Sequence, residues 1–196
     1  MRFKILEDIG DSIFPQWDIT LDLYIKSYLD IFLTHKNINE TNIMEIVEYD
    51  IVYELSMFDE YFEIDMIFSL YTRNYKDIYI TILTKLFLNN MIDFYIIDEQ
   101  TQPTLSNYKD DKYQAWAYFR DNFICKERFN AEDFCNTSWD TPNKWSKYNI
   151  NVMPTPKGTK YFNEILAPRF YNKYKDLEVE IDYKGNIIQW IGKINR

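Results

Sequence analysis

One stretch of the chain constrains the fold most, because it is strongly acidic and yet apolar enough to enter a core. Residues 37–72 hold no Lys or Arg and nine acidic side chains: Glu40, Glu45, Glu48, Asp50, Glu54, Asp59, Glu60, Glu63 and Asp65. Apolar residues recur at three- and four-residue steps over residues 43–58. The pattern predicts a helix with one apolar stripe, from which Glu45, Glu48 and Tyr49 point away.

The charge of the chain is concentrated in its first third. Residues 1–72 hold fifteen acidic and four basic side chains, a net charge of −11, whereas the remaining residues sum to +2. A field of this sign attracts cationic partners and repels nucleic acid. The alternative to partner binding is that each of these carboxylates simply lies on the solvated face of a helix.

Length and composition predict one folded domain over residues 1–196. With 46% hydrophobic residues, the chain is long enough to bury about 70% of its unfolded surface. The two cysteines, Cys125 and Cys135, are interpreted as reduced packing residues. Glu7 and Asp8 interrupt the start of the chain, and no apolar run approaches the ~20 residues of a membrane span, so we expect a cytoplasmic protein.

Residues 1–37 are predicted to form a strand at 3–6 and a helix from Asp18 to about His35. Thr41 or Asn42 is expected to cap the acidic helix that follows. A short helix at 64–71, a third helix at 78–87 that Asn89-Asn90 can end, and a strand at 91–97 come next. The lone His35 is interpreted as a residue favoured by the end of a helix rather than as a catalyst.

A return strand at 149–153 and a helix opening at Thr155 with the segment TPKG complete this order of elements. Three helices, a strand, a return strand and a helix that a TxKG segment opens resemble the winged-helix superfamily. The resemblance implies a winged-helix-like core over residues 43–98 and 148–166, with residues 99–147 as an insertion. In that insertion we expect a helix at 110–123, with Trp116, Trp139 and Trp145 as satellite core or as partner contacts.

The end of the chain shows the alternation of a β-hairpin over residues 177–191, with its turn at 183–186. We expect the last strand to pair with the strand at 3–6. The predicted fold class is therefore α+β, with a predominantly helical winged-helix-like core, an N-terminal helix, an inserted region and a C-terminal hairpin.

The sequence lacks the motifs of an enzyme. It has no Gly-rich phosphate loop, nucleophile elbow or Cys/His pair. Asp59, Glu60, Glu63 and Asp65 could hold a hard cation through their carboxylates, but neither a histidine nor a glycine-turned loop supports such a site. The segment Asp182-Tyr183-Lys184 has the acid-x-Lys pattern of a nuclease core, but a turn is the better interpretation of it. We therefore predict no catalytic residues, no metal and no cofactor.

DNA binding, the usual role of a winged helix, is the alternative function. The third helix offers few phosphate-binding side chains, so a separate basic patch would have to bind the DNA. Its candidate residues are Lys144, Lys147, Lys157, Lys160, Arg169, Lys173 and Lys175.

A small acidic protein without catalytic machinery is similar, in size, charge and organisation, to bacterial immunity proteins that neutralise nuclease toxins. The resemblance implies that carboxylates meet the Lys and Arg with which the toxin holds nucleic acid. The predicted partner-binding residues are Glu45, Glu48, Tyr49, Asp59, Glu60, Tyr61, Glu63 and Asp65. Phage proteins that mimic nucleic acid share these properties, so that alternative stays open.

Overall fold

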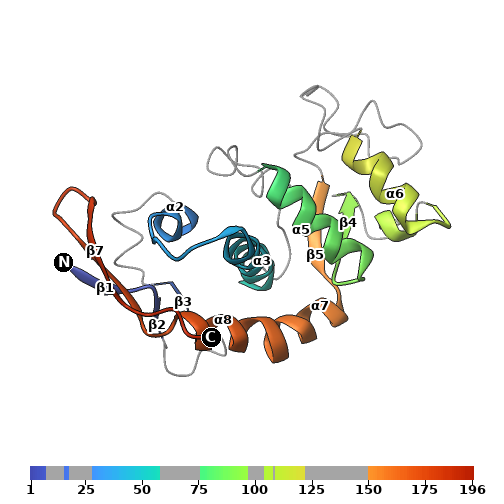
Figure 1. The fold of residues 1–196 in the computed structure, drawn as a ribbon. Helices are drawn as coiled ribbons and strands as arrows, with labels where there is room; N and C mark the ends of the chain where they lie inside the picture. The colour runs from blue at the N-terminus through green and yellow to red at the C-terminus, as the bar shows by residue number, and fades with distance from the viewer. Residues whose placement is uncertain (8–15, 18–27, 58–75, 97–103, 108, 122–149) are drawn as a thin grey trace. The chain divides into compact units, whose positions relative to one another are not determined.

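The computed structural model describes residues 1–7, 16–17, 28–57, 76–96, 104–107, 109–121 and 150–196 (Figure 1). The chain packs as two compact units, the first formed by residues 1–49 with 160–196 and the second by residues 50–159. The single domain expected from the sequence stays a prediction. The fold is of the α+β class, as predicted.

The first unit contains a three-stranded antiparallel sheet in the order β1-β6-β7. Its elements are β1 (Arg2–Lys4), β2 (Leu6–Glu7), β3 (Gln16–Trp17), α2 (Tyr28–Leu33), the start of α3 (Glu40–Met57), the π-helical turn η6 (Phe162–Leu166), α8 (Ala167–Tyr174), β6 (Leu177–Ile181) and β7 (Ile187–Gly192). The predicted C-terminal hairpin is confirmed as β6 and β7. The expected partner of the first strand is wrong, because β1 pairs with β6 and not with the last strand.

One face of the sheet is buried and the other is more exposed to solvent, because buried and partly exposed residues alternate along β6. Leu177, Val179 and Ile181 are fully buried, while the acids between them are partly exposed. Phe32 of α2 packs against the rings of Trp190 and Tyr174, with centroids 6.4 and 5.1 Å away. Burial of these apolar side chains holds α2, α8 and the sheet together in the first unit.

Pro168 explains the wide π turn that precedes α8. Proline has no N–H and its ring clashes with the carbonyl four residues earlier, so an ordinary helical turn is disfavoured there. Instead the N–H of Ala167 bonds the carbonyl of Phe162, five residues back. The large side chains of Phe162, Leu166, Phe170 and Tyr174, which follow one another at four-residue steps, are all buried. Four-residue steps drift around a regular α-helix, and the wide turn offsets that drift.

The second unit places helices around a two-stranded antiparallel pair, β4 with β5. Its described elements are the end of α3, α5 (Lys76–Leu88), β4 (Ile92–Ile96), the 3₁₀ turn η2 (Leu105–Asn107), α6 (Lys112–Phe119), β5 (Ile150–Pro154) and the start of α7 (Pro156–Tyr161). The predicted third helix and the two strands are confirmed. The predicted helix at 64–71 and most of residues 18–35 lie outside the described residues.

Trp116 belongs to the core of the second unit. Its side chain is fully buried, and its ring lies 5.8 Å from the rings of both Phe87 and Phe94. Helix α6 begins after Asp111, whose carboxylate accepts hydrogen bonds from the N–H groups of Tyr113 and Gln114. The satellite-core interpretation of Trp116 is therefore confirmed, whereas Trp139 and Trp145 lie outside the described residues.

The TPKG segment begins α7 as the sequence predicts. The N–H of Gly158 donates to the Thr155 hydroxyl over 3.1 Å, which caps the helix. Glycine is required at position 158, because a Cβ there would lie 1.8 Å from the carbonyl oxygen of Met91. Helix α5 ends at the predicted asparagines, where Asn90 adopts φ 59°.

None of the helices in the described part of the chain combines the length and apolar character that a membrane span requires.

Candidate functional site

Three of the eight predicted partner-binding residues lie on helix α3 within the first unit. They are Glu45, Glu48 and Tyr49. The other five, Asp59, Glu60, Tyr61, Glu63 and Asp65, lie outside the described residues. The described part of the candidate site is therefore α3 with the elements of the first unit that face it.

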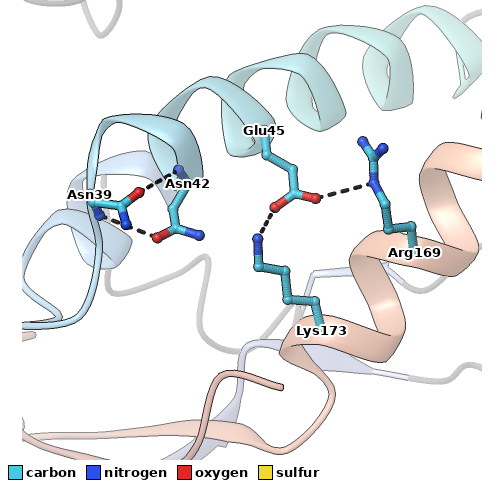
Figure 2. Close-up of polar contacts among 5 residues, drawn as sticks. All are labelled: Asn39, Asn42, Glu45, Arg169 and Lys173. Atoms are coloured by element: carbon cyan, nitrogen blue, oxygen red, sulfur yellow. Dashed lines mark hydrogen bonds and ion pairs between the residues drawn. The ribbon is translucent and has the colours of Figure 1, made fainter. Parts of the chain in front are cut away.

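Asparagines position the start of α3. The N–H of Asn42 donates to the side-chain oxygen of Asn39 over 3.1 Å, and the N–H of Asn39 donates to the side-chain oxygen of Asn42 over 3.3 Å (Figure 2). This reciprocal pair satisfies N–H groups that the first turn leaves without helical partners. The cap is Asn39 rather than the expected Thr41 or Asn42, since the helix begins at Glu40.

Glu45 points from α3 toward two basic side chains of α8. One carboxylate oxygen accepts from Lys173 and the other lies 3.2 Å from Nε of Arg169 (Figure 2). The Glu45 side chain is only 13% exposed, compared with 23% for Lys173 and 49% for Arg169. Two cations one helical turn apart thus bracket a largely buried carboxylate. Glu45 is therefore paired within the first unit and is not a free surface charge.

Glu48 lies one turn further along α3 and is 4% exposed. The hydroxyl of Tyr161 donates to its carboxylate over 2.8 Å. Burial, followed by the charge of Glu48, raises the pKa of Tyr161 to about 12, while Arg169 opposes the rise. Burial and the nearby Glu45 charge likewise raise the pKa of Tyr174. We call Glu45, Glu48, Tyr161, Arg169 and Lys173 the α3–α8 network.

Tyr49 does not point away from the packed side of α3, so that expectation is wrong. Its ring is fully buried and stacks on the ring of Phe170, with centroids 3.9 Å apart and planes inclined by 6°. Four consecutive residues of the helix, Ile46 to Tyr49, are buried. Burial of consecutive residues means that α3 packs on more than one side, which a single-stripe pattern does not predict. Glu48 and Tyr49 are thus parts of the interior.

A third acid of residues 37–72, Asp50, accepts a hydrogen bond within the second unit. The hydroxyl of Tyr79 donates to its carboxylate over 2.9 Å. Burial raises the pKa of Asp50 to about 6, although the hydrogen bond from Tyr79 opposes the rise. Glu45, Glu48 and Asp50 therefore all have partners within the chain.

The described members of the candidate basic patch have contacts within the chain. Arg169 and Lys173 contact Glu45, and Nζ of Lys157 donates to the carbonyl of Asn89 over 2.9 Å. The other described members, Lys160 and Lys175, lie 3.9 Å from the Glu164 carboxylate and 3.4 Å from the Asn172 side-chain oxygen, respectively. Lys144 and Lys147 lie outside the described residues. Arg169 and Lys173 thus share one carboxylate, whereas Lys157 and Lys175 have neutral oxygens as their hydrogen-bond partners.

His35 is a packing residue in the structure. Its Nδ1 accepts from the N–H of Asn37 over 3.1 Å, and its ring lies edge-on to Trp190 at 5.1 Å. Burial, with a smaller contribution from Lys36, lowers its pKa and favours the neutral imidazole. Among the described residues, no group of three or more His, Cys, Asp or Glu side chains is arranged to hold a metal ion.

Sequence reasoning missed that the basic residues of α8 are the partners of α3. Arg169 and Lys173 lie four positions apart, the spacing that places both on one helical face, and this signal was present in the sequence. The pairing itself joins residues more than 100 positions apart, which no local pattern reveals.

Comparison of the chain with protein-family models, with curated proteins and with solved structures finds no match.

Proposed function

We propose that the protein binds and inhibits a basic protein, and that the partner is a nuclease-type toxin domain that this chain neutralises as an immunity protein. The observation that carries the proposal is the net charge of −11 over residues 1–72, against +2 over the rest of the chain. Such a charge favours association with a cationic surface and disfavours association with phosphates.

Among the acids of residues 37–72, those at 59–65 are the best candidates for the contact. Glu45, Glu48 and Asp50 already accept ion pairs or hydrogen bonds from within the chain. Asp59, Glu60, Glu63 and Asp65 follow directly after α3, with Tyr61 between them as a candidate aromatic contact. We propose that Glu45, Glu48 and Tyr49 stabilise the first unit and are not themselves contacts with the partner.

We also propose that the core is winged-helix-like. The antiparallel pairing of β4 with β5 after α5, and the start of α7 at Thr155, support this interpretation. A DNA-binding regulator is the alternative that such a core suggests. The pairing of Arg169 and Lys173 with Glu45 makes that alternative less favourable, because these cations already have partners. A phage inhibitor that mimics nucleic acid would use the same acidic surface.

The first test is recovery of the partner from the lysate of the native host. The tagged full chain is held at low and at physiological salt, and retained polypeptides are identified by mass spectrometry. We expect one basic polypeptide at near-equal molar amount, retained less well as salt rises. Recovery of nucleic acid without a stoichiometric protein would overturn the proposal in favour of a DNA binder.

Paired charge reversals test the position of the contact. The variant E60K/E63K changes the proposed segment, and the control D77K/D110K makes the same change in net charge at two exposed acids of the same unit. We expect the first variant to slow partner association at least tenfold at low salt and the control to slow it much less. Equal effects of the two variants would show that only overall charge matters and would refute the assignment to residues 59–65.

A further inference from the structure

We draw no further inference here: the strongest candidate, the exposed apolar patch that Met1, Tyr183 and Ile188 form at the hairpin-turn end of the β1-β6-β7 sheet, carries no proposal because nothing in the structure shows what covers it.

Discussion

Replacing Glu45 by Gln separates a structural role for the α3–α8 network from a role in partner binding. The substitution keeps the size of the side chain and one acceptor oxygen, but it removes the charge that Lys173 and Arg169 share. We therefore expect E45Q to unfold more easily than the wild-type chain while it retains binding of the partner.

The size of the effect follows from the exposure of the two cations. Lys173 is largely buried, and a hydrogen bond to a charged group contributes roughly 1.5–3 kcal/mol at such a position. Arg169 is about half exposed, and an exposed ion pair contributes only ~0.2–1 kcal/mol. Because Gln still accepts one hydrogen bond, we expect a net loss of about 1–2 kcal/mol in the free energy of unfolding.

Urea unfolding followed by circular dichroism measures this loss. A destabilisation of that size lowers the midpoint by about 0.5–1 M urea if the slope stays constant. E40Q, at an exposed position in the first turn of the same helix, is the matched control, with an expected loss of about a few tenths of a kcal/mol. A double-mutant cycle of E45Q with K173M should give a coupling energy of roughly 0.5–3 kcal/mol.

The opposite pattern would refute the reasoning. If E45Q unfolded at the wild-type urea concentration but lost the partner in the retention assay, Glu45 would be a contact residue, and the structural role of the α3–α8 network would be wrong. An absence of coupling between positions 45 and 173 would likewise exclude their ion pair as a source of stability.

Three other substitutions test separate parts of the structure. G158A should lower the free energy of unfolding by ~1–3 kcal/mol, because its Cβ would meet the Met91 carbonyl, although alanine is the better helix former by about 1 kcal/mol. The folded-state pKa of Asp50 lies near 6, above its unfolded value, so its contribution is complete at low pH and is lost as pH rises through 6. D50N should therefore remove roughly 2–3 kcal/mol of the difference in stability between about pH 4 and pH 7.5. Y161F should cost ~1–3 kcal/mol in urea unfolding, since the buried Glu48 carboxylate loses a donor.

Each of these expectations has a result that contradicts it. A G158A chain more stable than wild type would mean that the backbone at Met91 moves away at little cost. For D50N, a pH dependence identical to that of the wild type would exclude Asp50 as a titrating group in this range. An unchanged midpoint in Y161F would mean that Glu48 finds another donor.

Local patterns predicted the local elements of this fold. The alternation of residues 177–181 predicts β6, and the Thr155-Pro156 pair predicts the start of α7, because a strand face and a helix cap are both decided by a few neighbouring residues. The asparagines at 89 and 90 predict the end of α5 for the same reason.

Long-range packing is what the local patterns did not predict. Tyr49 was expected on an exposed face, but its partner Phe170 lies more than 100 residues later. The pairing of β1 with β6 rather than with β7 likewise joins residues that are far apart in the sequence. The candidate site was predicted as a set of charges, yet which charges stay available depends on these distant partners.

The charge asymmetry of the sequence does not persist as an asymmetry between the two units. Residues 1–49 with 160–196 hold fourteen acids and eleven bases, a net charge of −3, whereas residues 50–159 hold seventeen acids and eleven bases, a net charge of −6. Chain topology therefore brings the basic C-terminal residues to the acidic N-terminal ones, as the pairing of Glu45 with Lys173 and Arg169 illustrates. Within the acidic stretch that carries the proposed function, the highest local density of charge is the four acids within residues 59–65, and this is why reversal of that segment should act more strongly than reversal of two distant acids in the same unit.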